Sequence, residues 1–207
     1  MAIKPILFNT EMVRAILDGR KTCTRRLVRF LPGENPQWTG YIRDGLMLYN
    51  GRNEPCIMKA PYQPGDILYV RETWCDDRQF THDSTPGRYF YKASESGNFK
   101  WKPSIHMPKE AARIFLKVTD VRVERLQDIT PKDAENEGVG NLFYEDIGYS
   151  EKNYGTEVDP EYGIAKEQFA WLWESTIKKS NLDRYGWDAN PYVWVIEFER
   201  CEKPEGV

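Results

Sequence analysis

The chain has 207 residues, of which 40% are hydrophobic, 29% charged and 14% aromatic, and its net charge is −3. This composition is typical of a globular protein with a sizeable core, and the net charge argues against a strong electrostatic attraction to nucleic acid. No segment approaches the roughly 18 consecutive apolar residues of a membrane helix, and charges interrupt the apolar stretch near the N-terminus. We therefore expect neither a membrane span nor a signal peptide, and a soluble, cytoplasmic protein.

Cysteine and histidine offer little support for a metal site. The only histidines are His82 and His106, and the four cysteines lie far apart without a CxxC pair: Cys23, Cys56, Cys75 and Cys201. The spacing predicts free thiols in a reducing cytoplasm, and we expect no bound metal and no cofactor.

The N-terminal thirty residues combine an amphipathic helix with an unusually polar strand. Asn9 or Thr10 can cap a helix over residues 11–18, which has one apolar face and is ended by Gly19. The segment 20–28 that follows is too polar for a buried strand. Read as a strand, it has one wholly polar face, which we expect to line a cleft or to face water: Thr22, Thr24 and Arg26.

Charge is unevenly distributed along the chain. Residues 1–30 hold seven basic side chains against two acidic ones, whereas residues 130–162 hold nine acidic side chains against two basic ones. Either the N-terminal segment forms a basic surface that attracts phosphate, or the two segments neutralise one another in the fold.

Several strands are predicted in the middle of the chain. A Pro64–Asp66 turn leads into a strand over residues 67–74, and a short strand is expected at 88–92. In residues 113–128 the apolar positions alternate and then change phase, which predicts a bulge or bend near Thr119 and Asp120, as in a strand that curls round a small barrel: Ile114, Leu116 and Val118, then Val121 and Val123.

The C-terminal third is predicted to hold two helices and a closing strand. Thr130 caps a short helix that Gly138 ends, a second helix begins at Asp159 and Pro160, and an alternating strand covers 192–199. We interpret the whole as one domain over 1–207, with irregular insertions at about 31–63, 76–110 and 140–158. The predicted fold class is α+β, a small PUA-like β-barrel with flanking short helices rather than a doubly wound sheet.

Glu137 is a candidate functional acid. It falls in the last turn of its predicted helix, where the negative end of the macrodipole disfavours a carboxylate by roughly 0.3–1 kcal/mol. A destabilised carboxylate is a clue to a functional site. The alternative is an exposed acid that pairs with an arginine.

Lys21 and Thr24 form the second candidate constellation. A lysine beside a hydroxyl can act as the base that activates an oxygen nucleophile, if a partly desolvated pocket lowers the pKa of the amine. The K-x-x-T spacing alone is a weak signal, and it gains weight here only from the polar face around it.

Six further residues could contact a ligand. Trp74 could stack on a base and Glu72 could read an amino edge, or Trp74 could be core and Glu72 an internal partner of Arg25 or Arg26. Asn190 precedes the last strand and could line the cleft; its neighbour Trp187 could do the same or simply pack. Tyr89 and Tyr91 could stack on bases or form cross-strand pairs.

Five ordered segments together resemble the ASCH domain, a branch of the PUA-like superfamily: GRKTCTRR, PGDILYVRETW, VTDVRVERLQDIT, AENEG and VWVIEFER. Longer members with a Trp-rich C-terminal half are similar to proteins of bacteriophages and prophages. The resemblance implies a cleft suited to a nucleoside or an RNA base. In members that hydrolyse N4-acetylcytidine, the catalytic lysine, threonine and glutamate match Lys21, Thr24 and Glu137, and Arg26 matches a following arginine.

Two functions follow from these residues. The first is a hydrolase that cleaves an amide on a modified cytidine, free or in RNA. The second is a non-catalytic RNA- or nucleotide-binding module in which Lys21, Arg25 and Arg26 contact phosphates. A third possibility is a phage accessory protein that binds a host factor through its insertions.

Overall fold

The computed structural model describes residues 2–31, 41–43, 47–49, 52, 54–57, 59–77, 87–139 and 160–205. The predicted insertion at 140–158 and His82 lie outside these residues. The chain divides into two compact units, each built from segments that are distant in sequence. Unit 1 comprises Met1–Gly19, Gln63–Thr119 and Phe198–Val207, and unit 2 comprises Arg20–Tyr62 and Asp120–Glu197.

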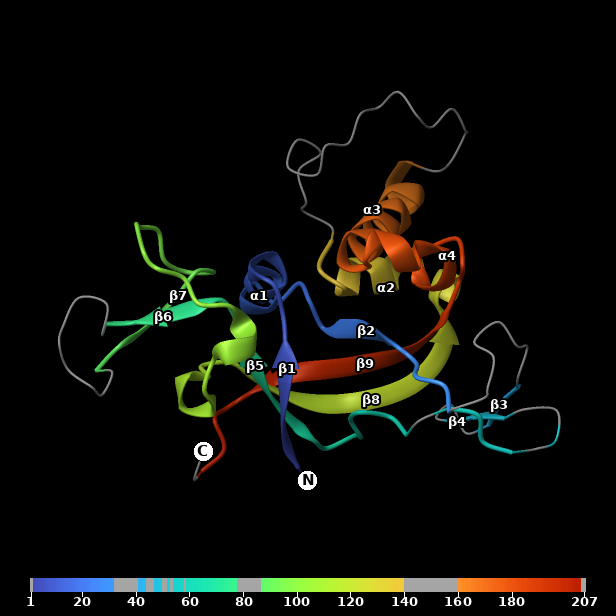
Figure 1. Cartoon of the computed structure of the whole chain (residues 1–207), viewed down its shortest axis with the longest axis horizontal. Coiled ribbons are helices and arrows are strands. Elements are labelled where there is room, and N and C mark those ends of the chain that lie inside the picture. Colours follow the sequence, from blue (N-terminus) through green and yellow to red (C-terminus); the bar gives the residue numbers. More distant parts are fainter. Residues whose placement is uncertain are drawn as a thin grey trace. The chain divides into compact units, whose positions relative to one another are not determined.

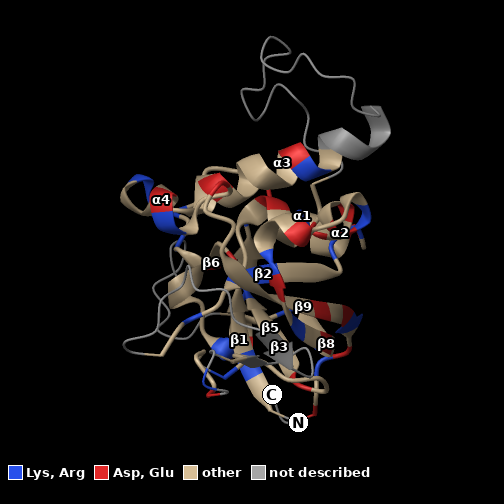
Figure 2. Cartoon of the chain, turned by 90° about the vertical axis from the view of Figure 1, so that its right-hand side faces the viewer, with Lys and Arg blue, Asp and Glu red and all other residues tan. Residues whose placement is uncertain are grey.

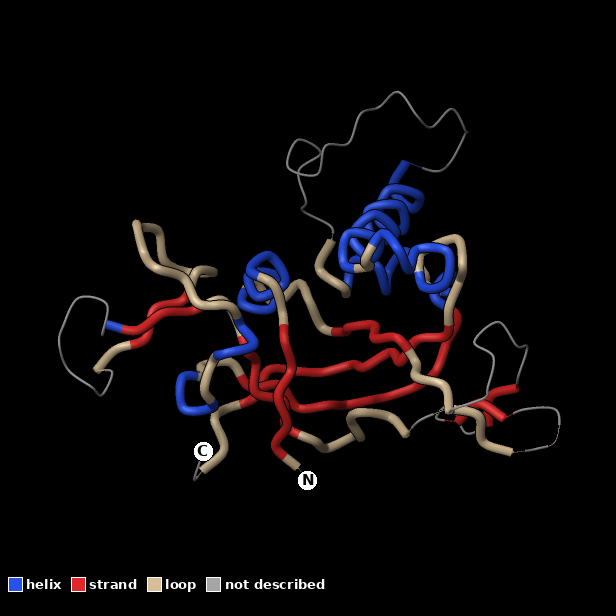
Figure 3. The backbone as a smooth tube through the Cα atoms, viewed as in Figure 1, coloured by secondary structure: helices blue, strands red, loops and turns tan. Residues whose placement is uncertain are grey.

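The fold is mixed α+β, as predicted, and its largest element is a five-stranded sheet in the order β1-β5-β8-β9-β2 (Figures 1 and 3). These strands are β1 (Ile3–Leu7), β2 (Cys23–Leu27), β5 (Ile67–Arg71), β8 (Phe115–Arg125) and β9 (Tyr192–Cys201). β1 and β5 are parallel, whereas β5 pairs with β8 and β2 with β9 in antiparallel fashion. Two antiparallel pairs stand apart from this sheet: β3 (Tyr41–Arg43) with β4 (Met47–Tyr49), and β6 (Trp74–Asp76) with β7 (Tyr89–Tyr91).

Unit 1 contains a helix whose ends follow the predicted signals. Helix α1 (Thr10–Leu17) is capped by Asn9, whose side chain accepts a hydrogen bond from the backbone N–H of Met12, and Gly19 follows its end with a φ of 77°. Two short 3-10 helices, η2 (Ser104–His106) and η3 (Lys109–Ala111), precede β8. The unit also holds a buried cluster around Trp74: Ile67, Trp74, Met107, Ala111, Ala112 and Phe115.

The predicted change of phase in β8 is confirmed by burial. Leu116 and Val118 are buried in the first half of the strand, and Val121 and Val123 in the second half. The change falls where the chain passes from unit 1 to unit 2. The apolar phase of β8 therefore changes between Val118 and Val121.

Unit 2 carries its helices on one face of β2 and β9 (Figure 1). They are α2 (Pro131–Asn136), α3 (Pro160–Thr176) and α4 (Leu182–Tyr185), with the 3-10 turns η4 (Leu126–Asp128) and η6 (Lys179–Asn181). Val193 and Val195 of β9 pack in a cluster with residues of these helices, among them Ala134, Phe169 and Trp173. Because these helices cover the second face of β9, the predicted closing strand is buried on both faces up to Ile196.

The described helices include none that is both long and apolar enough to span a bilayer.

Asp66, at the turn before β5, is a buried carboxylate whose ionisation stabilises unit 1. Burial opposes that ionisation, but Lys4 Nζ at 2.7 Å and the backbone N–H groups of Ala2 and Gln63 donate hydrogen bonds to the carboxylate. These donors outweigh the burial and lower the pKa of Asp66 below its ordinary value of 3.8. The stabilisation is therefore complete above the ordinary pKa and is lost as the pH falls through the lower, folded-state value.

We expect Asp66→Asn to lower the free energy of unfolding at neutral pH by about 1–3 kcal/mol, the usual loss for hydrogen bonds to a charged group. Urea denaturation at neutral pH and at steps below pH 4 measures this difference. The gap between the wild type and the variant is expected to narrow as the wild-type carboxylate becomes protonated. A gap that stays constant at every acidic pH would contradict this account.

Candidate functional site

Strand β2 distributes its polar side chains over both faces of the sheet. Cys23 and Arg25 lie on the face that α2 covers, where Arg25 is opposite Val195 of β9. Thr24 and Arg26 alternate with them and lie opposite Ile196 and Trp194 of β9. Figure 2 shows basic residues on β2 and acidic residues on β8 and β9 of the same unit.

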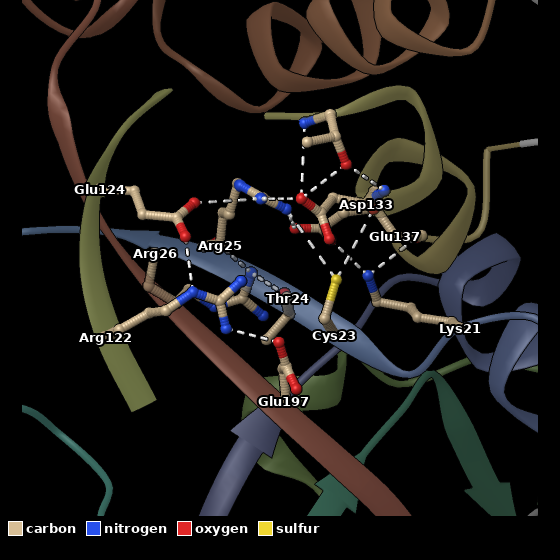
Figure 4. Close-up of polar contacts among 11 residues, drawn as sticks. Lys21, Cys23, Thr24, Arg25, Arg26, Arg122, Glu124, Asp133, Glu137 and Glu197 are labelled. Atoms are coloured by element: carbon tan, nitrogen blue, oxygen red, sulfur yellow. Dashed lines mark hydrogen bonds and ion pairs between the residues drawn. The ribbon is translucent and has the colours of Figure 1, made fainter. Parts of the chain in front are cut away.

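Lys21 and Glu137, predicted as parts of one site, are in direct contact (Figure 4). Lys21 Nζ lies 2.6 Å from Glu137 Oε2 and donates a second hydrogen bond of 2.8 Å to the Glu137 carbonyl oxygen. The two side chains are only 1% and 5% exposed. The alternative of an exposed acid is therefore wrong about exposure, whereas the arginine partner that it proposed is present as Arg25.

The position of Glu137 explains this pairing. Thr130, the predicted cap of α2, forms a capping box with Asp133, and Glu137 is the C-terminal cap, followed by Gly138 with a φ of 90°. A carboxylate at this end of a helix faces the negative end of the macrodipole. The Lys21 ammonium group offsets the negative charge of the carboxylate and the negative end of the helix dipole. It contacts the carboxylate and one of the terminal carbonyl groups of the helix.

Arg25 is the second cation of the cluster, and its side chain is fully buried. Its guanidinium group lies 3.4 Å from Glu137 Oε1, 3.5 Å from Glu124 Oε2 and 3.7 Å from Asp133 Oδ2. It also packs over the ring of Phe169 at 5.7 Å, while its Nε has no hydrogen-bond partner among the described residues. Arg25 therefore contacts carboxylates near both ends of α2, and Glu137 has a cation on each of its two oxygens.

The Cys23 thiol lies beside this cluster but is not suited to act as a nucleophile. Its Sγ is 3.7 Å from the Asp133 carbonyl oxygen and 3.9 Å from Arg25 Nη1. Burial, and next the negative charge of Glu137, raise the pKa of Cys23 to about 12. The thiol is therefore protonated at neutral pH.

Thr24 is held by Arg26 rather than exposed to solvent. Arg26 Nη1 donates to Thr24 Oγ1 at 3.0 Å and to the Arg25 carbonyl oxygen at 3.1 Å. Thr24 is 1% exposed, whereas Thr22, on the same predicted polar face, is exposed. The expectation that this face meets water therefore holds at Thr22 and is wrong at Thr24.

Arg26 sits in an environment that combines burial with nearby acidic groups. Burial lowers the pKa of its guanidinium group, and the Glu137 carboxylate and the Tyr62 hydroxyl act in the opposite direction. Burial raises the pKa of the Tyr62 hydroxyl, and the positive charge of Arg26 partly offsets this rise. Arg26 thus interacts electrostatically with Glu137, while its own hydrogen bond goes to Thr24 on the alternate face of β2.

An ion-pair network extends from Arg25 along β8. Glu124 contacts Arg25 through Oε2 and Arg122 Nε through Oε1, the latter at 2.5 Å. Arg122 also pairs with Asp120 at 3.0 Å and with Glu197 of β9. Asp120, Arg122 and Glu124 occur at every second position of β8, and this alternation was the one signal in the sequence that could have indicated a shared face.

Two basic residues of the N-terminal segment are neutralised by the later acidic segment, as one of the two interpretations of the charge distribution expected. Lys21 and Arg25 both pair with carboxylates of residues 133–137. In the described parts of the chain, His, Cys, Asp and Glu do not gather in groups of three or more that could hold a metal ion.

Comparison with known proteins gives no match to a family model, a curated protein or a solved structure. The assignment of a function therefore depends on the residues of the site and on the resemblance of the sequence segments.

Glu72 and Trp74 belong to unit 1, whereas the Lys21 cluster lies in unit 2. Glu72 is 1% exposed and forms a two-point ion pair with Arg113, at 2.9 and 3.0 Å, so the suggestion that it pairs with Arg25 or Arg26 is wrong. Trp74 is 3% exposed and lies in the core cluster of unit 1. Of the two roles suggested for it, base stacking and a place in the core, the structure shows the second.

Asn190 and the remaining candidate aromatic residues each make contacts within their own unit. Asn190 adopts a φ of 43° in the turn before β9, and its Oδ1 accepts a hydrogen bond of 2.8 Å from the backbone N–H of Gln127. Trp187 packs against the core cluster of unit 2. In unit 1, the ring of Tyr89 packs on Trp74 and the Tyr91 hydroxyl donates to the Ala111 carbonyl oxygen at 2.8 Å.

Proposed function

We propose that this chain is a cytoplasmic hydrolase with the PUA-like ASCH β-barrel fold, and that it removes the acyl group from an N4-acetylcytidine-like nucleoside. The observation that carries the proposal is the buried contact between Lys21 Nζ and Glu137 Oε2 at 2.6 Å. An amine and an acid this close provide a short route for proton transfer, and Thr24 follows Lys21 by three residues. The resemblance of the segments around these residues to the ASCH domain points to the same three side chains.

The reaction proceeds in two steps that together consume one water molecule. Thr24 Oγ1 attacks the acyl carbon, and its proton passes to the Lys21 amine after the ammonium group has transferred a proton to Glu137. Glu137 then protonates the nitrogen of the leaving cytidine as the C–N bond breaks. Water hydrolyses the resulting threonine ester, which releases the carboxylic acid and restores the hydroxyl group.

Arg26 supports the nucleophile in this scheme. Its Nη1 donates a hydrogen bond to Thr24 Oγ1, so the hydroxyl hydrogen is free to point toward a base. The same positive charge favours the negative charge that develops on the oxygen as the proton leaves.

A phosphate-binding role for Lys21 and Arg25 has less support than catalysis. Their side chains are 1% and 0% exposed, and both contact carboxylates. Side chains that are buried and neutralised in this way offer no surface to a polyanion. The site therefore favours a small, uncharged reacting group over a phosphate backbone.

Purified protein incubated with N4-acetylcytidine is expected to release cytidine and acetate, measured by liquid chromatography and mass spectrometry. N4-Methylcytidine, which lacks the acyl carbon, is the matched control and is expected to remain intact. The rate is expected to change little between about 50 and 200 mM salt, a range over which phosphate-dependent binding weakens steeply. If a panel of acylated nucleosides stays uncleaved while RNA is bound in a strongly salt-dependent manner, the non-catalytic binding module is the correct function.

A further inference from the structure

A ladder of three aromatic rings lies on the β6–β7 hairpin of unit 1 and on the segment that follows it. The ring centroids of Phe90 and Phe99 are 5.1 Å apart, and those of Phe99 and Trp101 are 4.9 Å apart. All three residues are partly exposed, and none belongs to the buried cluster around Trp74. The described part of the chain provides no hydrogen bond to the Trp101 indole N–H and only Phe99 as a ring neighbour of Trp101. Trp101 is thus the end of the ladder.

The local backbone is arranged to hold the ladder together. Trp74 and Lys102 exchange backbone hydrogen bonds of 3.2 and 2.7 Å, which place the segment 99–102 beside β6. Gly97 has a φ of 157°, and a Cβ atom there would lie 2.7 Å from the Phe99 ring. A side chain at Gly97 would therefore push Phe99 out of its place between Phe90 and Trp101.

Positive charge accompanies the rings, although the whole chain has a net charge of −3. Residues 87–102 contain four basic side chains and one acidic side chain, Glu95. Arg88 directly precedes β7 and Lys92 directly follows it, and both side chains are exposed. The Arg88 guanidinium group lies over the Phe90 ring at 4.7 Å. The opposite face of β7, with Tyr89 and Tyr91, packs inward instead.

We propose that this face of the hairpin is a binding platform for single-stranded nucleic acid. Partly exposed rings next to cations suit such a ligand, because bases stack on the rings and phosphates contact the cations. In this platform a base stacks on Trp101 at the end of the ladder, and the strand continues past Arg88 and Lys92. The platform shares no residue with the Lys21 cluster, so it can be tested whether or not the chain is a hydrolase.

Fluorescence anisotropy with a labelled single-stranded oligouridine of about 12 nucleotides tests the stacking contact. Trp101→Leu is expected to weaken binding by about tenfold, because base stacking on an aromatic ring contributes about 1–3 kcal/mol. Trp171→Leu is the matched control, since Trp171 is a 43% exposed tryptophan on α3 of the other unit, and it is expected to leave binding unchanged. Thermal unfolding of both variants establishes that they are folded.

The salt dependence of the same binding tests the cations. The double variant Arg88→Gln/Lys92→Gln is expected to reduce the slope of log K against log salt by about 1.4, because each phosphate contact to a single strand contributes about 0.7. Lys132→Gln, an exposed lysine of unit 2, is expected to leave the slope unchanged.

A comparison of DNA and RNA strands of the same length tests the sugar preference. Equal affinity for the two strands would show that the platform has no preference for the sugar, and tighter binding of RNA would indicate a contact to the 2′-hydroxyl. The proposal is overturned if the wild type fails to bind either strand at low salt, if Trp101→Leu behaves like Trp171→Leu, or if an acidic peptide competes fully with the oligonucleotide.

Discussion

Lys21→Met is expected to lower the free energy of unfolding by about 3 kcal/mol, the low end of the usual cost of breaking a buried ion pair. The substitution leaves Glu137 Oε2 and the adjacent helix carbonyl group without their ammonium partner in a site that is almost closed to solvent. Arg25 still contacts Glu137 Oε1, at the longer distance of 3.4 Å, and this is why the loss falls at the low end. Urea denaturation followed by circular dichroism measures the change.

Two further variants separate the ion pair from a general effect of losing a lysine. Lys132→Met removes a lysine that is 75% exposed and pairs with Glu135 on the surface of α2, and is expected to change stability by no more than about 0.5 kcal/mol. The double variant Lys21→Met/Glu137→Leu removes both charges, so it is expected to recover most of the stability lost in Lys21→Met. If Lys21→Met were as mild as Lys132→Met, the pair would not be the buried contact described above.

The parts of the fold that could be predicted from the sequence are those set by local interactions. Asn9 caps α1 and Thr130 caps α2 because each side chain accepts a hydrogen bond from a backbone N–H group three residues later. The change of phase in β8 could be read from apolar alternation alone. In the pairing of β2 with β9, Cys23 lies opposite Glu197, and no local pattern in the sequence specifies that these two strands are neighbours.

Within the site, sequence reasoning indicated the residues but not their contacts. The resemblance to the ASCH domain predicts Lys21 and Glu137 as parts of one site, and their side chains are in contact. For Arg25 the sequence suggested a phosphate contact or an ion pair with Glu72, whereas burial on the helix-covered face directs its guanidinium group to the carboxylates of Glu124 and Glu137. The partner of Glu72 was wrongly predicted because Arg113, which lies 41 residues away in the same unit, offers a two-point contact that no spacing in the sequence reveals.

Thr24→Val is expected to lower kcat for N4-acetylcytidine by at least about a thousandfold, the scale of loss seen when a catalytic nucleophile is removed. Valine has nearly the same shape as threonine but lacks the oxygen that attacks the acyl carbon. The stability cost is expected to be about 1 kcal/mol, because Arg26 Nη1 loses one acceptor and keeps the Arg25 carbonyl oxygen at 3.1 Å.

Thr24→Ser is the matched control for this substitution. Serine keeps the hydroxyl group that accepts from Arg26 and loses only a methyl group, so its kcat is expected to stay within about tenfold of the wild type. Both variants are compared with wild type for thermal unfolding, which separates a lost nucleophile from a lost fold.

The central claim is that the Thr24 oxygen forms a covalent acyl intermediate, with Lys21 and Glu137 transferring the protons. Wild-type protein quenched with acid during turnover of N4-acetylcytidine and digested for peptide mass spectrometry reports on this oxygen directly. We predict an acetyl ester on the peptide that contains Thr24, and no such ester in Thr24→Val. Release of cytidine by Thr24→Val at the wild-type rate, without any acylated peptide, would contradict the claim.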